Sequence, residues 1–366
     1  MKLNVNKQDF LKSINTVIHV SYNKSQRSIL ECILIEAYND RVTLNAFDTV
    51  TAIETSLYAD IREEGVCAIP AKLLAEVVSK LPEGDISLEK SDESGIVISS
   101  SSTCIKLQEM DERQFPRFPE VEGETFVINK EILKRLVDKT VFSVYQTPDK
   151  PIFTGLLFEI EEMNLNVVGI DGVRMAKRSI EKLPTPAQRI VIPAKAVKEA
   201  ARLINDDTEE NVTVVTSKKA CFFLTEDFRI YTRLLEGEFM NYNNIIPPSF
   251  KTRIRVNVKM LENSLNMVSV ISRDQATNPV KLTVGFDTLT ITAKSEYGNA
   301  ADSLPILLEG ETMTIFLNAK YVMDALRVID DEEVFINLEN SLKPCIIRPI
   351  KGEEYLYLIV PLNIKD

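Results

Sequence analysis

Two hydrophobic patterns alternate along the chain, one with the spacing of a strand and one with the spacing of a helix. Near the start, Leu3 and Val5 alternate with polar residues, and apolar residues then follow at helical spacing over 10–14. The same order returns at 126–136 and at 254–265. Each of these stretches predicts a strand that leads directly into an amphipathic helix.

A second kind of helical stretch begins each time with the same two residues. Ala71-Lys72, Ala194-Lys195 and Ala319-Lys320 each follow a short apolar run and a residue that commonly starts a helix, proline in the first two cases and asparagine in the third. We expect the prolines to occupy the first helical position. The pairs recur at an interval of about 125 residues, with neighbouring patterns in the same order. The sequence therefore predicts three copies of one structural unit.

Strand patterns fill the spaces between the predicted helices. The alternating or fully apolar runs are 29–36, 42–46, 66–69 and 85–88 in the first unit, 152–160, 165–170, 190–192 and 211–215 in the second, and 280–284, 289–293, 313–317 and 333–338 in the third. Each unit thus contains a strand, a helix and three strands, twice over, which predicts an α+β fold with helices on one face of antiparallel sheets. Turn-forming residues near Gly123 and Pro248 predict three domains, 1–123, 124–249 and 250–366.

Composition excludes several classes of protein. The five cysteines are scattered and show no metal-ligand spacing, so we expect buried thiols in a reducing compartment and no metal site; they are Cys32, Cys67, Cys104, Cys221 and Cys345. The chain has 12 glycines and no glycine-rich phosphate-binding motif, so no nucleotide cofactor is expected. The start of the chain carries no leader pattern, and no apolar run reaches the roughly 18 residues that cross a bilayer. These features predict a cytoplasmic protein.

The charge pattern separates the predicted helices from the rest of the chain. The formal net charge is −11, yet none of the six helical runs has a net negative charge. Lysines commonly lie on the solvated side of a helix, which is the simpler interpretation for any single run. Six equivalent helices on one face would instead form a basic surface, which suits sequence-independent contact with phosphates.

The sequence offers no catalytic constellation. His19 is the only histidine and lies beside apolar residues at the end of the first predicted helix, so we interpret it as incidental. Acidic pairs such as Asp330-Asp331 follow predicted helices, where solvated turns are commoner than metal sites. We therefore expect no enzymatic activity.

Several segments resemble the bacterial DNA polymerase III beta subunit, the DNA sliding clamp, over the full length of the chain. They are the three Ala-Lys helices, Leu81-Pro82-Glu83-Gly84, Phe115-Pro116, Asp171-Gly172-Val173-Arg174, 318–324 and 355–364. The resemblance implies three sliding-clamp domains, each built of two helix-plus-antiparallel-sheet half-repeats. It also implies a head-to-tail homodimeric ring with helices lining the hole. At its junction, Ile105 and Leu107 would meet Val270 and Ile271 of the partner subunit; the simpler alternative is that all four are core residues.

The resemblance further implies a pocket for partner peptides between the second and third domains. Its residues would be Phe153, Ile170, Gly172, Arg174, Met175, Met240, Asn244, Ile245, Asn318, Tyr321, Leu342, Leu358, Ile359, Val360, Pro361 and Leu362. Apolar, methionine-bearing walls with few polar groups suit short hydrophobic motifs. The simpler alternative is that 358–362 is only an apolar edge strand. Met240, Val173, Asn244 and Asn363 depart from the residues common in the family, which leaves the preferred motif open.

DNA contacts implied by the resemblance lie on loops and helices. They are Lys24, Lys72, Lys80, Gln146, Lys150, Lys195 and Lys198. The function that follows is that of a processivity factor, which encircles duplex DNA and tethers the replicative polymerase, the clamp loader and other replication or repair proteins. The alternative is a monomeric peptide-binding scaffold that does not encircle DNA.

Overall fold

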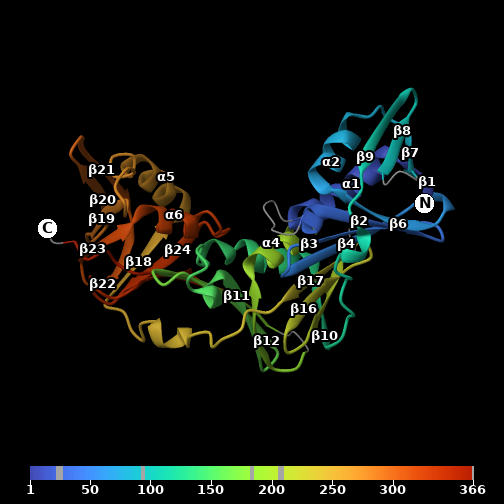
Figure 1. Cartoon of the computed structure of the whole chain (residues 1–366). Helices are drawn as coiled ribbons and strands as arrows, with labels where there is room; N and C mark the ends of the chain where they lie inside the picture. The colour runs from blue at the N-terminus through green and yellow to red at the C-terminus, as the bar shows by residue number, and fades with distance from the viewer. Residues whose placement is uncertain (22–27, 92–94, 182–184, 205–209, 365–366) are drawn as a thin grey trace. The chain divides into compact units, whose positions relative to one another are not determined.

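The computed structural model describes residues 1–21, 28–91, 95–181, 185–204 and 210–364. The chain forms two compact units (Figure 1). Unit 1 contains Met1–Ile132 and Lys195–Leu234, and unit 2 contains Leu133–Ala194 and Leu235–Asp366. Among the described residues no helix is long and apolar enough to cross a membrane.

Unit 1 contains two antiparallel sheets. The five-stranded sheet has the order β5 (Asp60–Glu63), β1 (Lys2–Asn6), β7 (Asp85–Ser91), β8 (Gly95–Ser100) and β9 (Thr103–Gln108). The eight-stranded sheet has the order β10 (Glu124–Asn129), β15 (Asn211–Thr216), β16 (Ala220–Leu224), β17 (Phe228–Arg233), β4 (Thr51–Tyr58), β3 (Arg41–Phe47), β2 (Cys32–Tyr38) and β6 (Gly65–Pro70). Strands from the first two expected domains therefore share one sheet, through the pairing of β17 with β4.

Unit 2 has the same organisation. The nine-stranded sheet has the order β14 (Gln188–Pro193), β11 (Gly155–Glu161), β12 (Asn164–Ile170), β13 (Arg174–Ile180), β26 (Tyr355–Ile359), β25 (Cys345–Pro349), β24 (Glu333–Leu338), β18 (Thr252–Asn257) and β22 (Leu307–Gly310). The four-stranded sheet has the order β21 (Gly298–Pro305), β20 (Thr288–Ser295), β19 (Pro279–Val284) and β23 (Met313–Asn318). Here the pairing of β13 with β26 joins the second expected domain to the third.

The described part of the chain contains six α-helices, at the predicted places. They are α1 (Lys7–Val17), α2 (Ala71–Lys80), α3 (Lys130–Asp138), α4 (Ala194–Leu203), α5 (Val258–Val268) and α6 (Ala319–Leu326). The asparagines before α1, α3 and α5 each accept hydrogen bonds at Oδ1 from backbone N–H groups of the first turn, and Asn318 does the same for α6. These caps satisfy N–H groups that have no partner within the helix. Pro70 and Pro193 end strands instead, so the helices begin one residue later than predicted.

The structure corrects several local predictions. The strands expected from residues 29 and 152 begin at Cys32 and Gly155, because Ser28–Glu31 and Pro151–Thr154 form 3-10 helices. Pro151 has no N–H to donate to a strand ladder, so it favours the first turn of a helix. His19 lies in a 3-10 turn after α1 and is exposed.

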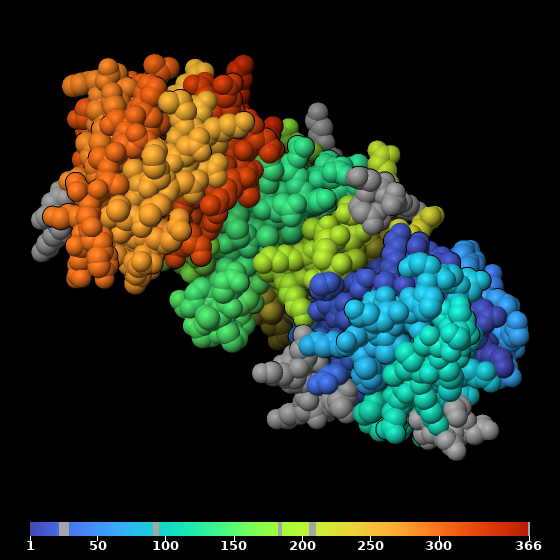
Figure 2. Space-filling view, turned by 90° about the horizontal axis from the view of Figure 1, so that it is seen from above, coloured from blue at the N-terminus to red at the C-terminus, as the bar shows by residue number. Residues whose placement is uncertain are grey.

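Apolar residues of the helices and sheets form the cores. In unit 1, α1 and α2 lie side by side, and their surfaces meet in the dark and light blue part of Figure 2. In unit 2, α5 and α6 pack against β20 and β23 over one continuous core. Four of the five thiols are buried as expected, but Cys104 is exposed on β9, because its strand alternates between a covered and an open face. Among the described residues no cluster suits a metal ion.

Candidate functional site

A tight turn between β12 and β13 carries the first polar group of the expected peptide pocket. The carboxylate of Asp171 accepts hydrogen bonds at Oδ1 from the backbone N–H groups of Val173 and Arg174, at 3.0 and 2.9 Å. Gly172 between them has a φ of +94°, a conformation that costs glycine little and other residues more. The sequence Asp-Gly-Val-Arg therefore folds locally into a turn that aims Arg174 toward α6.

Arg174 is held by groups from its own turn and from two other segments of unit 2. Its guanidinium donates from Nε to Asp171 Oδ2 at 2.8 Å, from Nη1 to Asp324 Oδ2 at 2.7 Å, and from Nη2 to the carbonyl of Phe142 at 2.8 Å. The same group lies 4.4 Å from the centre of the Tyr321 ring, a cation–π contact. Both carboxylates are largely buried, so these charge-assisted bonds fix the guanidinium in one orientation.

The apolar residues of the expected pocket form a cluster beside this turn. Ile170, Met175 and Leu358 are 1–2% exposed and belong to one buried core cluster. Partly buried residues pack against the cluster, namely Phe153, Met240 and Ile245. A peptide on this surface would thus contact mainly the second group, while the three buried residues form the floor beneath it.

The tail of the chain runs along the same turn. The N–H of Val360 donates to the carbonyl of Val173 at 2.9 Å, and the N–H of Leu362 donates to the carbonyl of Phe316 at 2.8 Å. Val360 is 38% exposed, Pro361 and Leu362 are partly exposed, and Ile359 is buried in the main core of unit 2. Asn318 is buried as the cap of α6, whereas three predicted residues lie exposed outside the cluster: Gly172, Asn244 and Leu342, the last at 72%.

The residues predicted to contact DNA fall into different groups. Lys72, Lys80 and Lys198 are exposed on α2 and α4 of unit 1. Lys195 is also exposed in part, but its Nζ lies 2.5 Å from Oδ2 of the buried Asp48. In unit 2, Gln146 donates to the carbonyl of Val144, and the Lys150 ammonium lies 5.5 Å from the centre of the Tyr145 ring. Lys24 lies outside the described residues.

Ion pairs reduce the basic character expected of the helices. Lys7 is 6% exposed and contacts Glu83 at 2.9 Å, and Lys139 is 8% exposed and bound to Asp330. The Arg202 guanidinium contacts Glu199 at 2.7 Å. These cations neutralise nearby acids, so the helices present fewer free positive charges than their composition indicates.

The four expected junction residues differ in exposure. Leu107 is 6% exposed and Ile105 is partly buried, both on the edge strand β9. Val270 is 57% exposed after α5, and Ile271 packs against the core of unit 2. Val270 is therefore the residue of this set with the largest apolar surface still open to a partner.

Comparison with known proteins was decisive for the family. Models of the DNA polymerase III beta subunit match the chain in three segments: the N-terminal domain at residues 1–119, the central domain at 127–241 and the C-terminal domain at 243–363. The beta sliding clamp of Halalkalibacterium halodurans is 30% identical over 98% of each chain. This chain belongs to the family of DNA polymerase III beta subunits, the beta sliding clamps.

Solved structures of the family have the same fold. The DNA polymerase sliding clamp of Bacillus subtilis is 27% identical, covers 100% of both chains and gives a TM-score of 0.96. The beta subunit of Streptococcus pyogenes DNA polymerase is 26% identical with the same coverage and a TM-score of 0.94. The α+β fold of three sliding-clamp domains, expected from the sequence, is thereby confirmed.

The expectation from sequence missed two groups at the clamp's candidate pocket. Asp324 and the carbonyl of Phe142 bind the guanidinium of Arg174, although neither was among the predicted site residues. Asp324 lies on α6, on a turn adjacent to Tyr321, and this spacing of three residues along a helix was the available signal. The carbonyl of Phe142 gave no signal, because the contact joins two distant segments through a backbone atom.

Proposed function

We propose that two copies of this chain close head to tail into a ring around duplex DNA. In this role the clamp tethers the replicative polymerase, the clamp loader and other replication or repair proteins, in the cytoplasm and without catalytic activity or a cofactor of its own. We place its domains at 1–123, 124–249 and 250–366. The segments that match the N-terminal and central family models, 1–119 and 127–241, fall inside the first two ranges, whereas the C-terminal match, 243–363, begins seven residues before the third.

The observation that carries ring closure is a strand junction that occurs twice within the chain. At β17–β4 and at β13–β26, the last strand of one domain pairs antiparallel with the fourth strand of the domain before it. Two strands in these positions of the repeat have no such partner within the described part of the chain. They are β9, the last strand of the first domain, and β21, the fourth strand of the third domain, and both are sheet edges. A third junction of the same kind, made between two copies, would cover both edges and close the ring.

The repeat also predicts the register of that junction. Arg229 faces Glu54 in β17–β4, and each residue has a counterpart in the strands that remain. Counted across the strands from the corresponding Asn6 and Asn129, Ser99 corresponds to Leu224. Cys104 pairs with Ser99 as Arg229 pairs with Leu224, so Cys104 takes the place of Arg229. Counting across β6, β2, β3 and β4 from Pro70, and across β23, β19, β20 and β21 from Asn318, puts Ala301 in the place of Glu54.

The predicted register keeps the two faces of the strands in phase. Cys104 and Ala301 are both exposed, while their neighbours Ile105 and Ala300 are both partly buried. Side chains alternate between the faces of a strand, so a shift by one residue would place buried positions opposite exposed ones. This agreement supports pairing of Cys104 with Ala301 of the partner subunit.

Cross-linking tests both the ring and its register. Cα atoms directly opposite in antiparallel strands lie about 4.5–5.5 Å apart, which a disulfide can bridge. The variant Ala301→Cys should therefore form a covalent dimer with the native Cys104 on mild oxidation, whereas Ala300→Cys should not, because its side chain points to the other face. Equal cross-linking of the two variants would refute the register.

Retention on DNA tests the function itself. Loaded clamp should stay on nicked circular DNA and leave once the circle is cut, because only a closed ring is held by topology. The oxidised Ala301→Cys ring should withstand high salt on the circle. Equal loss from circular and linear DNA, together with a native mass of 41.3 kDa, would favour the monomeric scaffold.

For the partner pocket, we propose the surface around Arg174 described above. Support comes from the fixed guanidinium, the adjacent apolar cluster and the partly exposed tail at 360–362. Such a surface offers a few fixed polar groups within an apolar, adaptable wall, which suits a short hydrophobic motif. For DNA, the exposed Lys72, Lys80 and Lys198 are the strongest candidates, because a free ammonium can neutralise a phosphate.

A further inference from the structure

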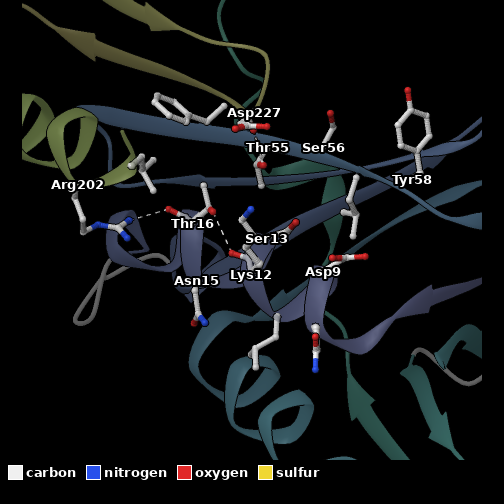
Figure 3. Close-up of a pocket in the computed structure, with 15 residues that line it drawn as sticks. Asp9, Lys12, Ser13, Asn15, Thr16, Thr55, Ser56, Tyr58, Arg202 and Asp227 are labelled. Carbon is white, nitrogen blue, oxygen red and sulfur yellow. Dashed lines mark hydrogen bonds between the residues drawn. The ribbon is translucent and has the colours of Figure 1, made fainter. Parts of the chain in front are cut away.

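A cavity of about 710 Å³ lies within unit 1, between α1 and the junction of β4 with β17. Figure 3 shows Asp9, Lys12 and Thr16 on the α1 side, and Thr55 with Asp227 on the opposite side. Leu57, Leu203 and Phe228 add apolar walls. This volume falls in the range of small-ligand sites, about 300–1,000 Å³.

The corresponding place in unit 2 can be identified residue by residue. Thr55 pairs with Phe228 in the first junction, and Arg178 pairs with Tyr355 in the second. Thr55 therefore corresponds to Arg178, and the preceding turn residue Asp227 corresponds to Glu354. The asparagine caps of α1 and α3 align the two helices in the same way.

In unit 2 this place is filled by two cationic side chains. Arg178 is 7% exposed, with Nη2 3.6 Å from Glu354 Oε2 and its guanidinium 5.8 Å from the centre of the Tyr355 ring. Lys139, the last residue of the α3 region, is 8% exposed and bound to Asp330. Both cations are thus buried beside acids at the place that corresponds to the cavity of unit 1.

In unit 1 threonines stand in both places. Thr55 corresponds to Arg178, and Thr16, counted from the asparagine caps, corresponds to Lys139. Both hydroxyls donate to backbone carbonyls, Thr55 to Asp227 at 2.8 Å and Thr16 to Lys12 at 3.0 Å. The shorter side chains leave the cavity open. Among the described residues they also leave Asp227 without a cation, whereas its counterpart Glu354 contacts Arg178.

The charges that face the cavity favour a cationic occupant beside Asp227. Arg202 also lines it, but its guanidinium is engaged by Glu199 at 2.7 Å and by the carbonyl of Thr16 at 3.2 Å. Among the ion pairs of the described residues, none includes Asp9, Lys12 or Asp227. Lys12 also lines the cavity, from α1 (Figure 3), but no ion pair among the described residues joins it to Asp227.

We propose that this cavity binds an arginine side chain of a partner polypeptide. The guanidinium takes the position that Arg178 occupies in unit 2, against the carboxylate of Asp227, and the aliphatic stem lies along Leu57 and Phe228. An arginine side chain fills only part of the cavity, so neighbouring residues of the same polypeptide have room to enter. This site is separate from the pocket around Arg174 and does not depend on ring closure.

Titration of the full-length protein with N-acetyl-arginine amide tests the proposal. The neutral isostere N-acetyl-citrulline amide serves as the matched control ligand, and we expect it to bind at least about tenfold more weakly than the arginine probe. The arginine probe should likewise bind the Asp227→Asn variant at least about tenfold more weakly than it binds the unmodified protein. Glu354→Gln, the same change at the filled junction, should leave binding unaltered. Equal affinity of the two ligands, or no effect of Asp227→Asn, would overturn the proposal.

A second variant fills the site from within. Thr55→Arg reproduces the residue of the second junction, so it should raise the melting temperature and abolish binding of the arginine probe. Unchanged binding by a folded Thr55→Arg variant would show that the ligand lies elsewhere. Competition by spermidine that is stronger than competition by an arginine-containing peptide would replace the partner polypeptide with a polyamine and so contradict the assignment.

Discussion

Replacement of Asp324 by alanine tests whether the fixed guanidinium of Arg174 matters for stability and for peptide binding. Asp324 is a cleaner choice than Asp171, which also orders the backbone of 171–174. The other ion pair of Asp324, with the exposed Arg327 at 3.7 Å, contributes little. Both side chains are well covered, at 11% exposure for Arg174 and 16% for Asp324.

The expected cost follows from three terms. Loss of a hydrogen bond from a largely buried charged group costs about 2–3 kcal/mol. The full cost of an unpaired buried charge is not reached, because Arg174 keeps Asp171 and the carbonyl of Phe142. Removal of an acid near the C-terminal end of α6 raises the free energy of unfolding by about 0.5 kcal/mol, because a negative charge is unfavourable there. The higher helix propensity of alanine raises it by about 0.5 kcal/mol more. The net loss of unfolding free energy is about 1–2 kcal/mol.

Calorimetry and peptide titration measure the two consequences. For a unit of this size, Tm falls by about 2–4 °C per kcal/mol, so we expect a decrease of about 2–8 °C in the transition of unit 2. The affinity for a fluorescent polymerase peptide should fall about tenfold, because the guanidinium is no longer held in one orientation. The matched control is Glu353→Ala in an exposed turn. If Asp324→Ala equals this control in both assays, the reasoning about Arg174 is wrong.

Three further changes test other parts of the structure. Thr49 has a φ of +81°, and Thr49→Gly should stabilise the protein by about 1 kcal/mol, whereas Gly172→Thr at the corresponding turn should destabilise it by a similar amount. The hydrogen bond from Lys139 holds the pKa of Asp330 below its ordinary value. Lys139→Met should therefore lower Tm at pH 7, and its difference from the unmodified protein should shrink as pH falls below about 4. Lys198→Ala should reduce the salt slope of DNA binding by about 1.

Each of these predictions has a clear contrary result. Equal Tm values for Thr49→Gly and the unmodified protein in calorimetry would show that the positive φ stores no strain. For Lys139→Met, a Tm difference from the unmodified protein that stays constant between pH 7 and pH 3 would mean that ionisation of Asp330 does not contribute to stability. For DNA, an unchanged slope in a filter-binding titration over salt concentration would remove residue 198 from the interface.

The local part of the fold was predictable from sequence because its signals lie within a few residues of one another. The three Ala-Lys pairs, the apolar residues at helical spacing and the alternating strands predicted the positions of the six described helices and the order of the half-repeats. The predicted strand starts at residues 29 and 152 were wrong, because these residues lie in the 3-10 helices Ser28–Glu31 and Pro151–Thr154. An apolar run does not distinguish a short 3-10 helix from a strand. The pocket residues came from a family resemblance, which named positions and not contacts.

The sequence alone determined the repeat, the fold class and the family of this clamp, because periodic patterns and adjacent motifs survive in one dimension. Only the tertiary structure decided which charges are free. Lys139 and Lys195 look alike in sequence to Lys198, yet distant acids bind the first two, since ion pairing depends on which segments meet. The structure likewise showed that two equivalent junctions differ, one filled by Arg178 and the other left open at Thr55. A repeat fixes corresponding positions, but the volumes of the side chains at those positions decide whether a cavity remains.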